Sequence, residues 1–324
     1  MPSFPYTPQK IYRALKEPER ISKEIRRHRR DFYRWALEVN SRFYRRYRPR
    51  ASNGISVMDH DWDTLLVLDA CRYDLYCELS PLGGTCRPVV SRGSQSWEFM
   101  KENFVGRELH DTVCVTANPH TYEIPDGTFH AVEYLLEDYW DESARTVRPS
   151  DVVEATFETA ERYPNKRLLV HFMQPHFPFL GPTGDSFEHS GVEIHLEDSE
   201  QSGAIHPWEG LMFDSSLNPE TVITAYRENY EIVFPHVERL VGELPGLTVL
   251  TSDHGNLLGE YTFPVPVKTY GHPPGIYRQE LLTVPWVQFE TQGERRPITT
   301  ELPGESEKPS EQTIENRLRA LGYR

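Results

Sequence analysis

Short apolar runs alternate with amphipathic segments along most of the chain. After residue 61, runs of strand length are separated by longer stretches in which apolar residues recur at helical spacing. The predicted strands are 64–68, 112–116, 167–173, 247–251 and 284–289. The predicted helices are 96–105, 149–163, 219–244 and 311–321. Because strands separated by helices favour parallel pairing, the pattern predicts an α/β fold, with a mostly parallel central sheet flanked by helices.

Two segments depart from this alternation. Residues 181–217 are polar and punctuated by Gly, Ser and Pro, which predicts a long loop or lid rather than a core element. Residues 10–48 predict one or two basic helices with a break at Pro18. Their apolar stripe, interleaved with arginines, continues through Phe32, Trp35, Ala36, Phe43 and Tyr47. We therefore divide the chain into a basic helical arm with its linker (1–60), a catalytic domain (61–300), and a second linker with a C-terminal helix (301–324).

Charge is distributed unevenly between the arm and the rest of the chain. The 324 residues carry a net charge of −14, yet residues 1–50 hold 15 of the 35 Lys and Arg residues and 5 of the 49 Asp and Glu residues. The arm is therefore at +10 and the rest at −24. Such an arm is typical of a helix that docks on an anionic membrane or a lipid-linked glycan. Packing of the arm's apolar stripe on the acidic body, whose charge the arm would neutralise, is favoured over such docking, and contact with a nucleic-acid backbone is the least favoured.

Composition excludes several classes of protein. A mean hydropathy of −0.60 and the lack of a long apolar run exclude a membrane bundle. No apolar leader is visible at the start, and four cysteines are too few for a disulfide scaffold, so the sequence predicts reduced thiols and a cytoplasmic location, with peripheral membrane contact through the arm. The acidic, Lys-poor body fits a salt-adapted organism, although an Arg bias also follows from a GC-rich genome.

Reactive residues follow several predicted strands. Asp69, Asn118, His176, Asp253 and His254 all come just after a strand, where ligands bind in sheets of this kind. The adjacent carboxylate and imidazole of Asp253 and His254 can face one cation, because the glycine that follows them lets the chain turn away tightly.

Four motifs in this chain resemble the alkaline phosphatase superfamily, particularly its sulfatase-like branch. They are TLLVLDACRYD (64–74), HFMQPHFPFLG (171–181), TSDHGN (251–256) and YGHPPGIY (270–277), in the family's order, within a resemblance over roughly 61–290. The resemblance implies a metal-dependent hydrolase of phosphate or sulfate esters that works through a covalent nucleophile. It also implies that Asp69, Asp253 and His254 bind one divalent metal ion. The imidazole favours zinc or manganese over calcium or magnesium.

The nucleophile is expected at the start of a helix, between the first and second ligands. Ser96 is the best candidate because it lies where the helix of residues 96–105 begins, and Ser94 is the second. Residues 94–98 lack the proline and arginine of the sulfatase motif that is oxidised to formylglycine. A serine nucleophile therefore favours a phosphatase, phosphodiesterase or phosphotransferase mechanism.

Other polar residues are assigned to the substrate. The loop 171–176 lacks the acid of two-metal members, so we expect one metal ion, with His176 and His272 contacting substrate or protonating the leaving oxygen. Arg72 and Arg92 are candidates to clamp the anionic group, and Asn118 to donate a hydrogen bond to substrate, with a turn as the alternative. Two other functions stay open: a catalytically degenerate binding protein, and a nucleic-acid phosphodiesterase.

Overall fold

Seven strands form the central sheet, in the order β2-β11-β8-β1-β7-β3-β4. The computed structural model describes residues 18–47, 54–189, 206–213, 217–290, 293–295, 297–303 and 310–321. The sheet strands are β1 (Thr64–Asp69), β2 (Thr85–Val90), β3 (Leu109–Thr116), β4 (Phe129–Tyr134), β7 (Arg167–Pro175), β8 (Leu247–Ser252) and β11 (Thr283–Glu290). Within this sheet β11 runs antiparallel to both neighbours, whereas β1 is parallel to β7 and β8, as is β3 to β4 and β7. The predicted α/β class and mostly parallel sheet are confirmed.

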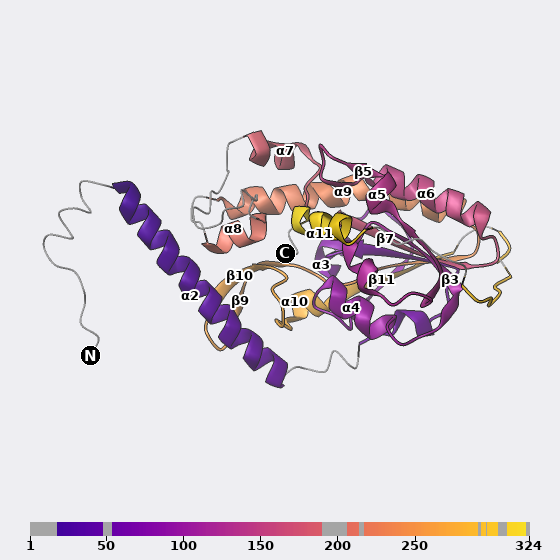
Figure 1. Ribbon diagram of the computed structural model, residues 1–324, viewed down its shortest axis with the longest axis horizontal. Helices are drawn as coiled ribbons and strands as arrows, with labels where there is room; N and C mark the ends of the chain where they lie inside the picture. The colour runs from indigo at the N-terminus through magenta and orange to yellow at the C-terminus, as the bar shows by residue number, and fades with distance from the viewer. Residues whose placement is uncertain are drawn as a thin grey trace, which may run out of the picture.

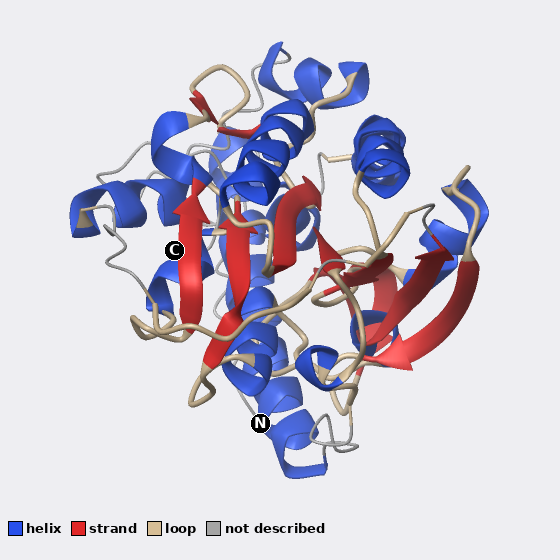
Figure 2. Cartoon of the chain, turned by 90° about the vertical axis from the view of Figure 1, so that its right-hand side faces the viewer, coloured by secondary structure: helices blue, strands red, loops and turns tan. Residues whose placement is uncertain are grey.

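Helices lie on both faces of this sheet (Figures 1 and 2). The described helices of the chain are α2 (Pro18–Tyr47), α3 (Tyr73–Leu79), α4 (Ser96–Asn103), α5 (Leu135–Asp138), α6 (Pro149–Arg162), α7 (Pro182–His189), α8 (Pro207–Phe213), α9 (Pro219–Glu243), α10 (Gln279–Leu282) and α11 (Glu311–Ala320), with the 3-10 turns η2 (Val57–Asp59) and η3 (Pro119–Glu123). Two short antiparallel pairs, β5 (Trp140–Asp141) with β6 (Thr146–Val147) and β9 (Leu257–Thr262) with β10 (Val267–Gly271), lie outside the main sheet.

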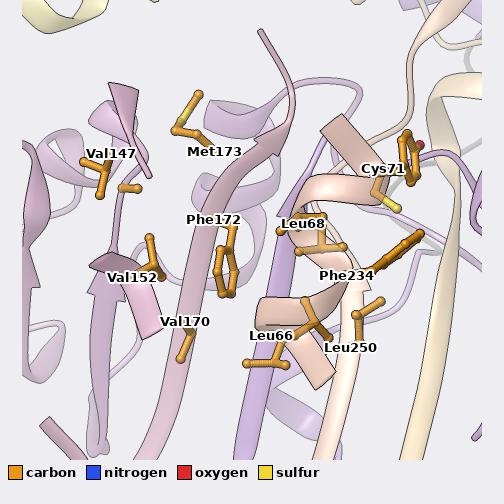
Figure 3. Packing of buried hydrophobic residues seen from close by; sticks show 14 of the residues in the cluster. Leu66, Leu68, Cys71, Val147, Val152, Val170, Phe172, Met173, Phe234 and Leu250 are labelled. Carbon is orange, nitrogen blue, oxygen red and sulfur yellow. The ribbon is translucent and has the colours of Figure 1, made fainter. Parts of the chain in front are cut away.

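The core has one hydrophobic cluster on each face of the sheet. Along β1, Leu66 and Leu68 point into the larger cluster, which also holds Phe172 and, from α9, Phe234 (Figure 3). Leu65 and Val67 point to the opposite face, into a cluster that includes α4 residues. Side chains of one strand alternate between its two faces, so β1 is buried on both sides. This double burial places the carboxyl end of β1, and with it Asp69, in the interior.

The basic arm forms one continuous helix where it is described. α2 is described from Pro18, and the predicted break at Pro18 together with residues 10–17 lies at or outside the limit of the described residues. The helix packs on the rest of the chain, because Asn40 is fully buried and its amide nitrogen donates to Thr262 Oγ1 and to the Val265 carbonyl, each at 2.9 Å. Of the described helices, none is both long and apolar enough to cross a membrane.

The prediction of a loop or lid over 181–217 is wrong for the part that the structure describes. That part contains α7 and α8, each beginning at a proline, a residue suited to the first helical position. In α8 the apolar residues Trp208, Leu211 and Met212 are buried in the main core, which the polarity of the surrounding segment concealed. Residues 190–205 and 214–216 lie outside the described residues.

Candidate active site

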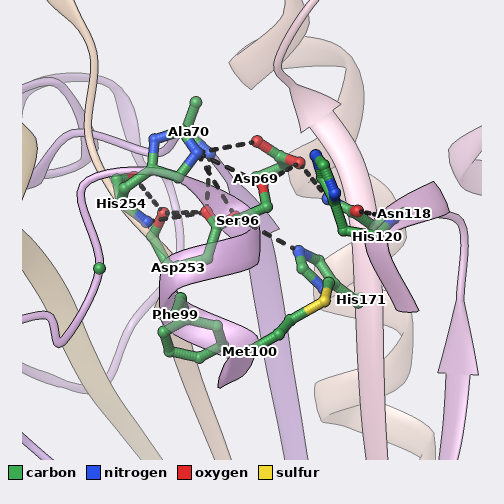
Figure 4. A network of polar contacts seen from close by, with 12 residues as sticks. Asp69, Ala70, Ser96, Phe99, Met100, Asn118, His120, His171, Asp253 and His254 are labelled. Carbon is green, nitrogen blue, oxygen red and sulfur yellow. Dashed lines mark hydrogen bonds and ion pairs between the residues drawn. The ribbon is translucent and has the colours of Figure 1, made fainter. Parts of the chain in front are cut away.

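Three of the predicted ligands meet at the carboxyl end of the sheet. Asp69 ends β1, and Asp253 and His254 follow the neighbouring strand β8; all three are fully buried. Each offers a ligand atom within 4.8 Å of the others, which makes them a group that can hold a metal ion. His254 Nε2 lies 3.6 Å from Asp69 Oδ1 and 3.5 Å from Asp253 Oδ2 (Figure 4).

The ring orientation of His254 is suited to metal binding. Its Nδ1 lies 2.7 Å from the Gly255 carbonyl oxygen, which can only accept, so Nδ1 carries the proton. Nε2 therefore presents a lone pair to the carboxylates of Asp69 and Asp253. Three electron-rich atoms that face one point in a buried site repel one another unless a cation lies between them. In metal sites the other ring nitrogen of a histidine ligand usually donates a hydrogen bond that orients the ring, as Nδ1 of His254 does to the Gly255 carbonyl.

Asp253 is held by backbone donors and keeps one oxygen for the site. Its Oδ1 accepts from the backbone N–H groups of Ala70 at 3.0 Å and His254 at 2.8 Å. Oδ2 has no hydrogen-bond partner among the described residues, and His171 Nε2 lies 3.7 Å away. Burial alone raises the pKa of Asp253, but its contacts with the imidazoles of His254 and His171 outweigh burial and hold the pKa below its usual value. The carboxylate is thus ionised, as a metal ligand must be.

Tight turns bring these residues together. Directly after Asp69, Ala70 has a φ of 57°, a conformation that L-residues other than glycine rarely adopt. The turn is fixed by the Asp253 contact and by Tyr226, whose hydroxyl donates to the Ala70 carbonyl. After His254, a Cβ on Gly255 would lie 2.1 Å from the Glu280 carbonyl oxygen, so this close approach requires glycine.

The two candidate serines have different surroundings. Ser96 is the first residue of α4 and fully buried, with Oγ 3.3 Å from Asp69 Oδ2 and 3.4 Å from His254 Nε2. Ser94 instead donates both its hydroxyl, at 2.9 Å, and its backbone N–H, at 3.0 Å, to Glu98 Oε2. Ser96 thus lies within the metal-binding group, and Ser94 supports the loop that leads into α4.

Asn118 lies behind the ligand Asp69. Its amide nitrogen donates to Asp69 Oδ2 at 2.7 Å, while its side-chain oxygen accepts from the backbone of His120 and so begins the turn η3. Asn118 therefore has the turn role that the sequence suggested, and its amide group contacts Asp69. His120, which our sequence interpretation did not select, points toward the same carboxylate in Figure 4.

Histidines form one wall beside the metal-binding group. His272, after β10, has its ring centroid 4.5 Å from that of His254 and 5.1 Å from that of His176. His206, at the start of α8, lies 5.5 Å from His176 and was missed because it belongs to the segment interpreted as a solvated lid. Burial lowers the pKa of His176 to about 4 and lowers the pKa values of His206 and His272 well below the usual range. All three rings are therefore neutral at pH 7.

The two predicted clamp arginines are bound to other groups. Arg72 Nε and Nη2 donate to both oxygens of Asp74, and Nη1 donates to Glu260 and to the Asn256 carbonyl. Burial alone lowers the pKa of Arg72, but these carboxylates raise it above the usual value. Arg92 donates to the carbonyls of Gly54 and Glu102. The structure therefore does not bring either guanidinium into the hydrogen-bonded group around Asp69.

The fold is similar to those of solved structures at low sequence identity. The C-terminal periplasmic domain of EptC from Escherichia coli, in complex with zinc, covers 74% of this chain and 76% of its own, with 14% identity and a TM-score of 0.43. An alkaline phosphatase superfamily protein from Vibrio parahaemolyticus covers 80% and 65%, with 12% identity and a TM-score of 0.37. The lipoteichoic acid synthase LtaP from Listeria monocytogenes covers 84% and 76%, with 11% identity and a TM-score of 0.37. No family model and no curated protein matches the sequence.

These neighbours correct the predicted location. The structures from Escherichia coli and Campylobacter jejuni are periplasmic domains. The cytoplasmic expectation is therefore wrong; it was based on the missing apolar leader and the few cysteines, and neither feature determines the compartment.

The family expectation agrees with the fold and the site. Residues from the predicted motifs, Asp69, His176, Asp253, His254 and His272, gather at the carboxyl edge of the sheet around one buried acidic group. The mostly parallel sheet, and the position of these motif residues at the ends of its strands, agree with the resemblance of the sequence to the alkaline phosphatase superfamily.

Proposed function

We propose that the protein is a metal-dependent enzyme that transfers or hydrolyses phosphate esters, with Ser96 as its nucleophile. The observation that carries this proposal is the position of Ser96 Oγ, 3.3 Å from one predicted metal ligand and 3.4 Å from another at the first residue of a helix. A nucleophile needs a group that lowers its pKa and donors that stabilise the transferring anion. The residues that would hold a cation, and the first turn of α4, lie beside Ser96 Oγ.

Asp69, Asp253 and His254 would hold the metal ion. Two carboxylates with one imidazole favour zinc or manganese, while calcium and magnesium prefer shells made of oxygen alone. When bound, the ion supplies positive charge that lowers the pKa of a neighbouring hydroxyl and neutralises an ester oxygen. The buried and unpartnered oxygen of Asp253 fits this donor set.

Ser96 would attack phosphorus through its Oγ. A Ser96 Oγ–P bond forms, the bond from phosphorus to the leaving oxygen breaks, and the Oγ proton passes to a neighbouring base. Backbone N–H groups in the first turn of α4 are available for the transferring group, because the first N–H groups of a helix have no partner within it. Water or a second alcohol then takes the phosphoryl group from Ser96.

His176 and His272 would contact the substrate or its leaving oxygen. His176 Nδ1 lies 2.6 Å from the Phe177 carbonyl and so carries the proton, which makes Nε2 the acceptor of this neutral ring. An anionic substrate beside these rings raises their pKa values, because a nearby negative charge favours the protonated form. Substrate binding would thus charge the group that protonates the leaving oxygen.

Phosphate esters are favoured over sulfate esters as the substrate class. Sequence 94–98 reads SQSWE, without the residues that direct serine or cysteine oxidation in sulfatases. An unmodified serine forms a phosphoserine intermediate directly. The charge of residues 10–50 predicts contact of the arm with an anionic membrane or a lipid-linked glycan. In this proposal, that contact brings the enzyme to the place where its ester substrate is found.

A paired serine experiment tests the proposal. Purified protein would be loaded with zinc or manganese and assayed on soluble phosphate mono- and diesters and on a sulfate ester. We expect Ser96→Ala to lose at least a hundredfold in kcat while keeping the metal, and Asp253→Asn to lose both metal and activity. Ser94→Ala, the matched control, should keep most of the activity, because its hydroxyl contacts Glu98.

Each alternative function has its own outcome in this experiment. Wild-type protein that binds metal but turns over no ester supports a degenerate binding protein. Cleavage confined to DNA or RNA, with binding that weakens steeply as salt rises, supports a nucleic-acid phosphodiesterase. Full activity in Ser96→Ala contradicts the proposed nucleophile.

A further inference from the structure

α2 has one face that is docked on the rest of the chain. Ala36 and Asn40 on this face are fully buried, and Asn40 also accepts at 2.8 Å from the backbone N–H of Val265, so its amide is bonded on both sides to the β9–β10 turn. Farther along the chain toward the N-terminus, Arg29 Nε donates to the Met212 carbonyl of α8 at 2.9 Å. The helix is thus attached to α8 through Arg29 and to the β9–β10 pair through Asn40.

A second flank of α2 presents large aromatic side chains to solvent. Phe32 is 49% exposed, Trp35 53%, Phe43 39% and Tyr47 66%. Their rings lie in two pairs, with centroids 5.9 Å apart for Phe32 and Trp35 and 4.8 Å apart for Phe43 and Tyr47. The predicted apolar stripe is therefore divided, since of its five members only Ala36 faces the body.

Two further exposed aromatic side chains lie in β9 and the β9–β10 turn, on either side of a residue that Asn40 contacts. Tyr261 is 49% exposed and Phe263 47%, and both flank Thr262, which accepts a hydrogen bond from Asn40. These six aromatics, Phe32, Trp35, Phe43, Tyr47, Tyr261 and Phe263, are called the aromatic face below. They account for six of the ten exposed large hydrophobic residues found in the described part of the chain, so exposure of this kind is concentrated here.

Exposed arginines lie on the same helix as four residues of the aromatic face. Arg34, Arg42, Arg45 and Arg46 of α2 are exposed. In the described part of the chain Arg42 pairs with Glu38 of the same helix, and an ion pair this exposed leaves the guanidinium available. Residues beyond the arm carry the acidic excess of the chain, so an anionic surface attracts this helix and repels the rest.

We propose that the aromatic face of α2 lies on an anionic phospholipid bilayer and holds the active site beside it. Aromatic rings and arginines together prefer the interface between headgroups and acyl chains, where the ring is buried and the cation stays with the phosphates. α2 packs on α8 and on the β9–β10 pair, and these elements carry His206 and His272 of the histidine wall. The proposed membrane contact does not depend on the proposed function. Access of the active site to a lipid-linked ester, in contrast, rests on the proposed function.

Co-sedimentation with vesicles tests the contact. The full chain would be mixed with phosphatidylglycerol–phosphatidylcholine vesicles and, separately, with pure phosphatidylcholine vesicles. We expect at least tenfold tighter binding to the anionic vesicles. Replacing Phe32, Trp35, Phe43 and Tyr47 together by serine should weaken that binding at least tenfold. The control, Val90→Ser with Val105→Ser, removes exposed apolar side chains elsewhere and should bind as the wild type does.

Two outcomes overturn the proposal. One is wild-type protein that does not bind anionic vesicles, and the other is a serine variant that binds as tightly as the wild type. If the wild type does not bind vesicles but is a dimer in solution, and the serine variant is a monomer, the aromatic face is an interface between two copies of the chain. Matching thermal unfolding of variant and wild type excludes a folding defect, because all four side chains are exposed.

Failure of the proposed function is recognised separately. Activity on a water-soluble phosphate ester should be the same in the wild type and the serine variant, since no substituted residue lies in the active site. Vesicle binding without any esterase activity would leave the membrane contact standing and contradict the enzyme. Activity on the soluble ester without vesicle binding would support the proposed enzyme and contradict the membrane contact.

Discussion

Replacing Asp69 by asparagine should stabilise the metal-free protein and abolish its response to metal. In the absence of a cation, Asp69 and Asp253 are two buried carboxylates with ligand atoms within 4.8 Å of each other, and both face the lone pair of His254 Nε2. At an effective dielectric constant of about 20, two unit charges at this separation repel with about 3 kcal/mol. The amide removes that repulsion, and its oxygen can still accept from Asn118.

The difference in stability between variant and wild type should nearly vanish when metal is present. In EDTA, Asp69→Asn should raise the free energy of unfolding by up to about 3 kcal/mol, or the melting temperature by about 5 °C for a chain of this size. Adding zinc or manganese at a hundred times its dissociation constant should stabilise the wild type by about 2.7 kcal/mol and leave the variant unchanged. The assay is thermal and urea unfolding with and without metal, with the exposed Asp138→Asn as control.

Two results would refute this reasoning. One is a variant clearly less stable than the wild type in EDTA, which would mean that the carboxylate of Asp69 is held by stabilising contacts that outweigh the repulsion. The other is an undiminished metal response in the variant, which would place the metal elsewhere. Both can be measured without any substrate.

Three further predictions follow from single contacts. Gly255→Ala should destabilise the protein by about 2 kcal/mol in urea unfolding, because its Cβ would lie 2.1 Å from the Glu280 carbonyl; an unchanged midpoint would contradict that close approach. Asn118→Ala should lower metal affinity about 10- to 100-fold by calorimetry, since it removes the donor that orients Asp69, and equal affinity would exclude this role. Burial lowers the pKa of His176 to about 4, so the His176 imidazole takes up a proton more readily in the unfolded chain than in the folded one. The free energy of unfolding should therefore fall as pH decreases from about 6.5 toward 4, by at most about 1.4 kcal/mol per pH unit from this group. His176→Gln should reduce this dependence of stability on pH.

The strand ends were predictable from the sequence because they follow a simple rule. A buried apolar run followed by Asp69, or by Asp253 and His254, places those side chains at the edge of a parallel sheet, and the structure brings them together there. The choice between Ser94 and Ser96 was not predictable. It depends on Glu98, one turn into α4, which takes the hydroxyl of Ser94 and leaves that of Ser96 to Asp69.

Other differences between the predictions from the sequence and the structure arise from contacts between distant parts of the chain. Arg72 could be read as a substrate clamp because Glu260, which pairs with it, lies 188 positions away. His206 could be read as solvated because its neighbours in sequence are polar, whereas Trp208, two residues later, anchors α8 in the core. On α2 the periodicity indicated an apolar stripe, but the docked face is centred on a polar residue, Asn40, whose bonds to Thr262 and Val265 set the rotation of the helix.

The hydrogen bond from the Ala70 backbone to Asp253 joins residues 183 positions apart. A chain that is still being synthesised therefore holds Asp69 at the end of β1 without the strand β8 that completes the metal-binding group. Contacts this far apart in sequence form late, because closing so long a loop costs conformational entropy that only the assembled sheet repays. Metal captured at this site should thus mark chains that have finished folding, and a fragment ending before residue 253 should neither bind the ion in this way nor gain stability from it.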